Sequence, residues 1–343
     1  MKWLVALSSL PGMGPVRMRA ILDGRSVEQA WELARRDERW SRAAACIDVD
    51  ALWQAHVDAD VDVLAPGDAA WPDVFHDDPE PPALLFARGD LTALDGPRVA
   101  ITGTRRCTYT GRDLARELGR DLADAGVRVV SGLAAGIDGA AHGGALQGSA
   151  PPVGVVGTGL DVVYPRWHGE LWHAVATRGL LLSEYPLGVG PERWRFPARN
   201  RLIAALADVV VVIESHASGG SMHTVDSALE RDRTVMAMPG SVRSPASAGT
   251  NALLAAGAPP ARDAGDVLVA LGLDARVGQR VAAPTRPGGD AGAVLDALGW
   301  QTSTLEHIAD RAGAPLGPVA VHLAGLERDG WLRERSGWYE RLR

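Results

Sequence analysis

The sequence predicts an α/β protein whose centre is a parallel sheet with helices on both faces. From residue 98 onward, short apolar runs alternate with helical stretches, and residues 209–213 form the strongest of these runs. Almost every run ends in Gly, Ser, Thr or Pro. Short, continuously apolar strands separated by helices are typical of a parallel sheet that is buried on both sides. Ligands of such sheets bind at the carboxyl ends of the strands, so we expect the functional site there.

The predicted strands share a run of Val, Ile, Leu, Ala or Met and a polar or glycine-rich exit. They are residues 99–101, 127–130, 153–156, 180–182, 209–213 and 235–238. Residues 111–125 are predicted to form a connecting helix, because Leu114, Leu118 and Leu122 recur at helical spacing. We assign residues 66–272 to this domain.

Before the sheet, residues 1–65 are predicted to form a small all-helical domain of the helix-hairpin-helix or SAM-like kind. Residues 18–22 and 30–34 carry apolar positions at helical spacing. The Pro-Gly-Met-Gly-Pro turn at 11–15 could offer backbone N–H groups to a DNA phosphate, and it could equally be an ordinary capped turn. The turn-rich segment 66–82 marks the boundary with the next domain.

After the sheet, residues 273–290 are rich in Ala, Pro and Gly and are predicted to form a linker. Residues 291–343 then predict three helices followed by a small hairpin around Gly337, which together describe a winged helix. The third of these helices, 318–326, offers no Arg, Asn or Gln to read base edges. We therefore interpret this domain as a module for protein interaction or dimerisation.

The composition of the chain excludes several classes of protein. The chain has 343 residues, of which 46% are hydrophobic and 22% charged, which excludes wholesale disorder. Apolar runs are too short for a membrane span, and the start shows no convincing signal peptide. Two cysteines suit a reducing compartment, so we expect a cytoplasmic protein that does not act on membranes. A net charge of −7 argues against coating duplex DNA by bulk charge, but it allows local basic patches.

The common nucleotide-binding motifs are missing. The first strand is followed by Gly103 without the second and third glycines of a dinucleotide fingerprint, and the chain contains no Walker loop. Scattered histidines show no metal-ligand spacing. We predict neither a cofactor nor a metal.

The most informative segment is residues 193–201, which holds four arginines, Trp194 and Phe196 but no acid. Cations that follow phosphates, and aromatic or guanidinium planes that stack on bases, are what a single-stranded nucleic acid requires. A merely solvated basic face would be expected to carry alternating acids. We expect these guanidiniums to be carried on loops at one rim of the sheet.

Two strand exits can add phosphate donors. Residues 218–224 form a Gly/Ser loop that opens a helix, and free N–H groups at such a helix start bind anions. Residues 102–106 add the guanidiniums of Arg105 and Arg106, whose planar forks match phosphate oxygens. For residues 218–224, a tight turn that requires glycine is the alternative interpretation.

Signals of catalysis are weaker. Carboxylates near strand exits, such as Asp138 and Glu184, could support a nucleotide hydrolase. His142 and His223 are better explained as helix-start or packing residues. We predict a protein that is not an enzyme, with a nucleotide hydrolase of the phosphoribohydrolase type as the alternative. A scaffold that holds a protein partner through the winged helix is a third hypothesis.

Several ordered motifs between Trp71 and Ala258 resemble the bacterial DNA-processing protein A family (DprA, also called Smf). They are the Ser-Gly-Leu-Ala-Ala-Gly-Ile-Asp run at 131–138, Gly-Thr-Gly-Leu-Asp at 157–161 with Tyr164-Pro165, Ser-Glu-Tyr-Pro at 183–186, Phe-Pro-Ala-Arg-Asn-Arg at 196–201, Met-Pro-Gly at 238–240 and Gly-Thr-Asn at 249–251. The chain departs from the family where Thr104 and Gly219 replace serines, and where arginines stand in place of the lysines expected in a DNA groove.

This resemblance implies an extended Rossmann-like domain that binds single-stranded DNA without sequence preference. It also implies a homodimer that protects the strand and loads a RecA-class recombinase during natural transformation and recombination. Arg105, Arg199 and Arg201 are expected to contact phosphates, and Phe196 to stack on a base or shape the pocket. The full set of predicted DNA-binding residues is Gly103, Thr104, Arg105, Arg106, Phe196, Arg199, Asn200, Arg201, Gly219, Gly220, Ser221, Thr224 and Asn251.

Overall fold

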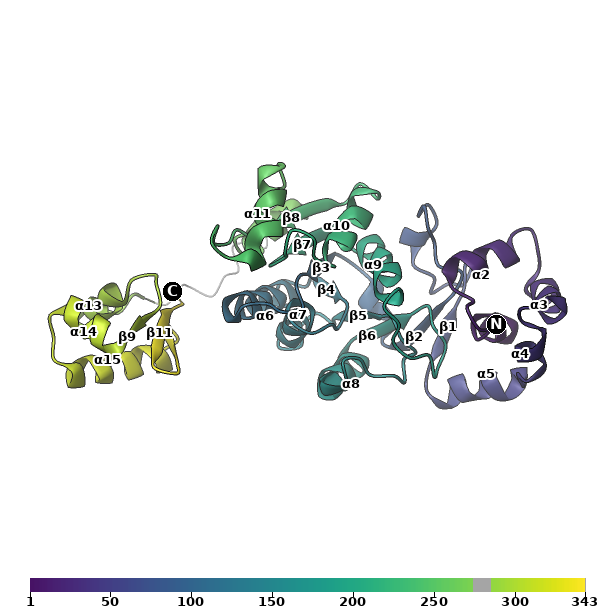
Figure 1. Cartoon of the computed structure of the whole chain (residues 1–343), viewed down its shortest axis with the longest axis horizontal. Coiled ribbons are helices and arrows are strands. Elements are labelled where there is room, and N and C mark those ends of the chain that lie inside the picture. The colour runs from purple at the N-terminus through teal and green to yellow at the C-terminus, as the bar shows by residue number, and fades with distance from the viewer. Residues whose placement is uncertain (274–284, 343) are drawn as a thin grey trace. The chain divides into compact units, whose positions relative to one another are not determined.

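The computed structural model describes residues 1–273 and 285–342 (Figure 1). Contacts divide the chain into two compact units, Met1–Gly278 and Gln279–Arg343. Most of the predicted linker, residues 274–284, lies outside the described residues. Within the described ranges, no helix is both long enough and apolar enough to cross a bilayer.

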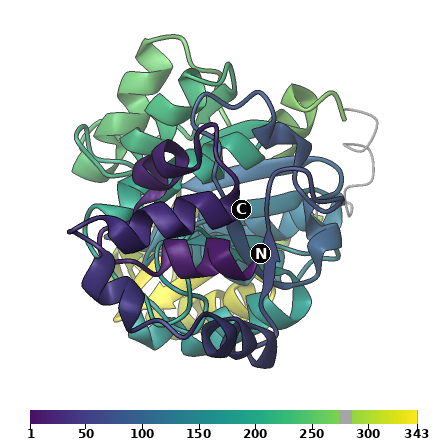
Figure 2. The ribbon, with the colours of Figure 1, turned by 90° about the vertical axis from the view of Figure 1, so that its right-hand side faces the viewer.

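The first sixty residues are helical, as predicted. The helices are α1 (Lys2–Ser8), α2 (Pro15–Leu22), α3 (Val27–Arg36), α4 (Ser41–Ala45) and α5 (Val49–Asp58). Two of these helices begin at side-chain caps. Ser26 and Gln29 form a capping box at the start of α3, and Asp48 caps α5. Their apolar faces pack together with one face of the sheet, and Figure 2 shows them in purple in front of it.

An eight-stranded sheet forms the core of the first unit, in the order β1-β2-β6-β5-β4-β3-β7-β8. The strands are β1 (Asp62–Leu64), β2 (Leu85–Gly89), β3 (Arg98–Thr102), β4 (Arg128–Ser131), β5 (Val153–Val156), β6 (Leu180–Ser183), β7 (Val209–Val212) and β8 (Thr234–Ala237). The six strands β3 to β8 pair in parallel, whereas β1 and β2 add an antiparallel edge. The predicted parallel core is confirmed, and the antiparallel strands β1 and β2 were not predicted.

Helices cover both faces of this sheet. They are α6 (Tyr109–Asp124), α7 (Ile137–Ala145), α8 (Gly169–Arg178), α9 (Arg195–Leu206), α10 (Met222–Leu229), α11 (Ala248–Ala255) and α12 (Ala264–Ala270), with short 3₁₀ turns at η1 (Asp73–Phe75), η2 (Leu91–Leu94), η3 (Arg166–His168) and η4 (Pro245–Ser247).

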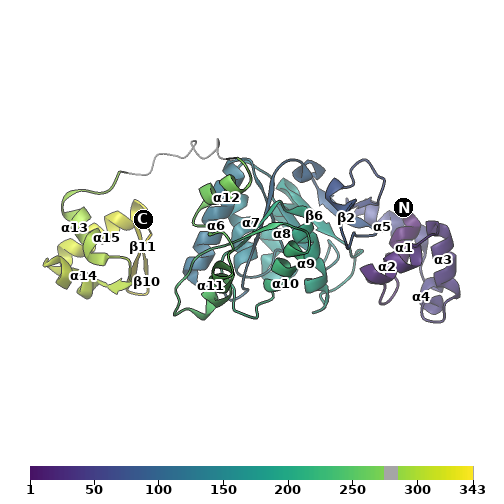
Figure 3. The ribbon, with the colours of Figure 1, turned by 90° about the horizontal axis from the view of Figure 1, so that it is seen from above.

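Successive side chains of each strand point to opposite faces of the sheet, and each face packs against its own set of helices. Val99 and Ile101 of β3 share a buried cluster with α6, α7 and α12, and Figure 3 shows α6 beside α7. Ala100, between them, shares a cluster with α9 and α10 on the other face. Successive side chains of a strand point to opposite faces, so a continuous apolar run is needed where both faces are covered. This arrangement places the start of α9 near the carboxyl ends of the central strands.

The second unit has its own apolar core, which includes Leu295, Ile308 and Leu323. Its elements are α13 (Gly289–Leu298), β9 (Ser303–Thr304), α14 (Leu305–Ala312), α15 (Leu316–Arg328), β10 (Leu332–Arg335) and β11 (Trp338–Arg341). The three strands pair in the order β10-β11-β9. Three helices and a hairpin are therefore present where they were expected. That this unit functions as a winged helix stays a prediction.

Candidate nucleic-acid interface

A cavity of about 110 Å³ lies at the carboxyl ends of β3, β4 and β5. Its wall comes from the loops that follow these three strands, from the segment around η3 and from the first two turns of α9. The carboxyl ends of parallel strands meet at one edge of a sheet, which is why segments so far apart in sequence converge here. The cavity contains three of the predicted residues, Arg105, Phe196 and Arg199.

Arg105 and Phe196 form one side of this cavity. The guanidinium carbon of Arg105 lies 4.9 Å from the centre of the Phe196 ring, and Tyr164 contacts the same ring at 5.2 Å between centroids. The loop that carries Arg105 is held in place because the Thr104 amide donates a 2.7 Å hydrogen bond to the carbonyl of Glu214. Arg105 itself is exposed, so its charge is accessible to an anion at the rim.

Arg199 lies deeper in the same cavity and is 3% exposed. Its Nη1 donates to the carbonyl oxygen of Val155, and its Nε has no hydrogen-bond partner among the described residues. Burial lowers the pKa of this guanidinium to about 10, while the nearby charge of Asp138 acts in the opposite direction. Arg199 therefore remains a cation at neutral pH, with donor capacity left at the floor of the cavity.

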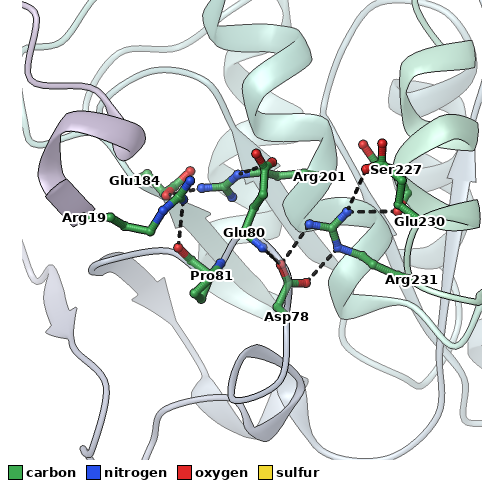
Figure 4. A network of polar contacts seen from close by, with 9 residues as sticks. All are labelled: Arg19, Asp78, Glu80, Pro81, Glu184, Arg201, Ser227, Glu230 and Arg231. Atoms are coloured by element: carbon green, nitrogen blue, oxygen red, sulfur yellow. Dashed lines mark hydrogen bonds and ion pairs between the residues drawn. The ribbon is translucent and has the colours of Figure 1, made fainter. Parts of the chain in front are cut away.

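Arg201 points elsewhere, and its predicted contact with phosphate is not supported by the geometry. Its Nη2 lies 2.6 Å from Oε1 of Glu184, and both side chains are buried. Figure 4 shows this pair together with Glu80, whose carboxylate lies 3.8 Å from Nε of Arg201. A guanidinium already enclosed by two carboxylates is not open to the phosphates of a strand.

The same network fixes residues 78–81 against the sheet domain (Figure 4). Asp78 accepts two hydrogen bonds from Arg231, at 2.7 and 2.8 Å, and both side chains are almost fully buried. Arg19 of α2 donates to the carbonyl of Pro81 at 3.1 Å. These contacts join the N-terminal helices to α9 and α10 through one loop.

The glycine-rich loop after β7 borders α9 but does not line the cavity. Asn200 Nδ2 donates to the carbonyl of Gly220 at 3.4 Å, which joins the loop to α9 next to Arg199. Gly220 is exposed, whereas Ser221 is buried and donates to Oγ of Ser215 at 2.8 Å. The Thr224 hydroxyl is buried and has no partner among the described residues.

The remaining predicted residues lie around this centre in different ways. Gly103 packs against Ile137 and the carbonyl of Glu214, so it shapes the loop. Arg106 is exposed beside Arg105. Asn251 is occupied by backbone: its Nδ2 donates to the carbonyl of Gly240 at 3.1 Å, and its Oδ1 accepts from the amide of Gly240 at 3.3 Å. We assign Asn251 no contact with a strand.

Some residues that line the cavity were not predicted from the sequence, among them Gly132, Thr158 and Trp167. Gly132 and Thr158 lie inside motifs that carried the family resemblance but were not assigned to the site. Trp167 follows Tyr164-Pro165, and the only signal for it is a large aromatic residue in a strand-exit segment.

Acidic and histidine side chains, among them Asp138 and His142, also lie near Arg199 of the cavity. Among the described residues, no three His, Cys, Asp or Glu side chains gather in a way that could hold a metal ion. His142 is fully buried, and its two ring nitrogens lie 3.2 Å and 3.1 Å from the carbonyls of Asp138 and Val153. This geometry supports a packing role for His142.

The fold and the cavity define a Rossmann-like α/β protein with an arginine-bearing, aromatic-walled site at its strand ends. Residues 62–272 match the family described as DNA recombination-mediator protein A. The chain belongs to this family, and the resemblance found in the motifs is confirmed.

Named relatives agree with this assignment. The chain is 36% identical to Protein Smf of Escherichia coli (strain K12) over 276 residues, which are 76% of this chain and 72% of that protein. It is 38% identical to DNA processing protein DprA of Bacillus subtilis (strain 168) over 189 residues, which are 55% of this chain and 64% of that protein. The match to the second relative thus spans less than two thirds of its length.

Two solved structures share the fold. DNA processing protein A from Streptococcus pneumoniae is similar with a TM-score of 0.65 and 31% identity, over 78% of this chain and 97% of that one. DNA processing protein A from Helicobacter pylori, described for its unique single-stranded DNA binding mode, is similar with a TM-score of 0.55 and 33% identity, over 62% and 96% of the two chains.

Proposed function

We propose that the protein binds single-stranded DNA without sequence preference, at the cavity that follows β3, β4 and β5. The observation that carries this proposal is the convergence of Arg105, Phe196 and Arg199 on one cavity from segments about ninety residues apart. Cationic groups beside aromatic rings are the combination that grips the backbone and bases of an unpaired strand. The relative from Helicobacter pylori, described as binding single-stranded DNA, supports the same assignment.

The distribution of charge favours binding of the strand at a local cluster of arginines over binding along a broad basic surface. The whole chain carries a net charge of −7, so a phosphate backbone is not attracted by the protein as a whole. Arg105 and Arg106 are exposed at the loop after β3, and Arg199 adds a buried cation below them. A strand that enters here meets cations over a short length, and its bases, because they are unpaired, can reach the aromatic walls.

We further propose that the bound strand is protected and passed to a RecA-class recombinase, in natural transformation and recombination. The family's description as a recombination mediator supports this partner. The proposal includes a homodimer and a binding role without catalysis. The proposal also places this activity in the cytoplasm, because two cysteines suit a reducing compartment.

The nucleotide-hydrolase alternative is not favoured. Family membership points to DNA processing, and two titratable side chains near the strand ends, Asp138 and His142, are engaged by the backbone. Asp138 is buried and accepts from the Gly132 amide at 3.1 Å, while His142 faces two backbone carbonyls.

The test compares a fluorescein-labelled single-stranded oligonucleotide with its matched duplex in anisotropy titrations of the full chain, at several salt concentrations. We expect tighter binding of the single strand, and affinity that falls linearly with the logarithm of salt concentration, because each neutralised phosphate releases counterions. Equal affinity for both DNAs, or affinity that does not respond to salt, would contradict the proposal.

A further inference from the structure

Trp167 stands at the rim of the DNA-binding cavity with 76% of its surface exposed. A tryptophan this open leaves a large apolar ring in water, although Trp is highly buried on average. Its neighbours in the cavity wall include Tyr164, Phe196 and Arg105. The exposed indole therefore lies where an incoming strand would be held.

The backbone beneath Trp167 is fixed even though the ring is free. The residue is the middle of the η3 turn (Arg166–His168). Nδ1 of His168 lies 2.9 Å from the carbonyl oxygen of Leu133, in the loop after β4. A Cβ placed on Gly139 would lie only 2.6 Å from Cε1 of His168, so α7 packs closely against the same imidazole. The turn is thus anchored to the sheet domain, and the indole is presented from a rigid base.

Phe196, which was predicted either to stack on a base or to shape the pocket, already has partners in the cavity. Arg105 lies over its ring at 4.9 Å, and Tyr164 packs against it at 5.2 Å with an interplanar angle of 32°. Trp167 instead meets His168 at 6.3 Å and 86°, a T-shaped contact that covers at most one face of the indole. The open aromatic face of this site belongs to Trp167, and Phe196 shapes the wall.

We propose that Trp167 is the stacking platform for one unpaired base of the bound strand. This inference rests on the proposed function. The cavity next to the indole, at about 110 Å³, is smaller than the roughly 150 Å³ cavity that holds a benzene ring, so it has no room for a stack of bases, and a single base would lie partly against the exposed indole. Arg105, exposed at the same rim, then contacts the phosphate beside that base. Stacking on an aromatic ring tolerates any base, which agrees with binding that is independent of sequence.

The experiment is a cycle that changes the protein and the DNA in turn. Wild type and Trp167→Ala are titrated, as full-length chains, with a labelled oligothymidine and with an abasic strand of the same length and charge. Removing the indole is expected to weaken oligothymidine binding by about 5- to 150-fold, the range found for loss of one base–aromatic stack. Affinity for the abasic strand is expected to stay unchanged, because that strand has no base to stack.

Two further variants sharpen the result. Trp167→Phe keeps an aromatic face, so it should restore much of the lost affinity for oligothymidine. Trp300→Ala removes a tryptophan that is 73% exposed in the second unit, and it should leave the difference between the two strands as in wild type. Thermal unfolding of each variant checks that the fold is retained, as expected for such an exposed side chain.

The outcomes separate this inference from the function beneath it. If wild type binds neither strand, the proposed function fails. Suppose that wild type binds single strands, but that Trp167→Ala either weakens binding of both strands equally or weakens binding of neither strand. The DNA-binding function then stands, and the stacking role of Trp167 is overturned.

Discussion

Arg201 of α9 and Glu184, directly after β6, form an ion pair in which Nη2 and Oε1 are 2.6 Å apart. Their side chains are only 7% and 4% exposed. One nitrogen of the guanidinium and one oxygen of the carboxylate have no further partner among the described residues. Burial raises the pKa of Glu184, and the charge of Arg201 opposes that shift. The pair therefore holds α9 against the sheet, and with it the cavity residues of that helix.

We predict that Arg201→Ala lowers the free energy of unfolding of the free protein. Loss of a DNA contact alone would leave that quantity unchanged. Removing one partner leaves the carboxylate of Glu184 buried without its counter-charge, which costs about 3–5 kcal/mol of the free energy of unfolding. Urea denaturation followed by circular dichroism measures the change.

Two variants serve as controls for this prediction. Arg193→Ala removes an exposed arginine two residues before α9 and should shift the free energy of unfolding by less than about 0.5 kcal/mol. The double variant Arg201→Met with Glu184→Leu removes both charges and should recover much of the loss. An Arg201→Ala protein as stable as wild type would show that the pair does not hold the helix.

The burial of Arg201 shows what a linear pattern cannot reveal. Residues 193–201 were expected to lie in a loop, but α9 begins at Arg195. On a helix of 3.6 residues per turn, positions two apart differ by about 200°, so Arg199 and Arg201 must face different directions. Composition identified the cationic segment, and helical geometry then divided it between the cavity and the core.

The parallel core could be predicted because strands that are buried on both faces must be apolar at every position. β7, four consecutive valines, is the clearest example. Strands β1 and β2 were missed for the opposite reason. β1 has three residues and begins with an exposed Asp62, so its pattern is too short to distinguish from a turn. Its pairing with β2 is a long-range contact that the local sequence does not specify.

The site was predictable in part for a similar reason. Arg105 was found as a cation in a strand exit, and Phe196 and Arg199 were found because arginines and aromatic residues gather at 193–201. Trp167 was missed because the sequence does not distinguish an aromatic loop residue that is packed from one that is exposed. Asn251 was assigned from a motif alone, and its amide is used by the backbone of Gly240.

Gly132→Ala is predicted to disturb both the fold and the site. A Cβ at this position would overlap the Arg199 guanidinium, which is buried and hydrogen-bonded to Val155. Overpacking of this kind costs about 1–3 kcal/mol, and the displaced cation should also weaken single-strand binding. Urea denaturation and anisotropy titration measure the two effects.

A second glycine provides the control. Gly143 lies inside α7 with open space where its Cβ would be. Gly143→Ala should therefore leave binding intact and raise the free energy of unfolding by about 0.5–1 kcal/mol, through helix propensity. If Gly132→Ala behaved like Gly143→Ala, the close packing of Arg199 against the loop after β4 would be refuted.

Stability is predicted to fall as the pH drops below about 6.5, because of His142. Burial lowers the pKa of this imidazole to about 4, and the charge of Arg199 lowers it further, against two backbone hydrogen bonds that raise it. The unfolded chain, with a pKa near 6.5, binds a proton in this window that the folded protein does not. The free energy of unfolding therefore decreases by about 1.4 kcal/mol per pH unit between these values.

His142→Gln isolates this effect. Other groups, including His56, whose pKa burial also lowers, titrate alike in both proteins. Between pH 7 and pH 5, wild type should lose about 2 kcal/mol more than the variant, since His142 is responsible for that part of the slope. Parallel pH profiles from urea denaturation of the two proteins would rule out the linkage.

Arg105→Ala is predicted to weaken single-strand binding and to reduce its salt dependence. The side chain is exposed, so the fold should not change, but a charge-assisted contact with one phosphate is lost. Affinity should fall at least about fivefold, and the slope of log affinity against log salt should become shallower by about 0.7, the value for one phosphate of a single strand. Arg262→Ala is the matched control, because Arg262 is also exposed but is paired with Asp266 at 2.8 Å and does not line the cavity. Anisotropy titrations from about 50 to 200 mM salt compare the three proteins. An unchanged slope for Arg105→Ala would remove Arg105 from the phosphate-binding site.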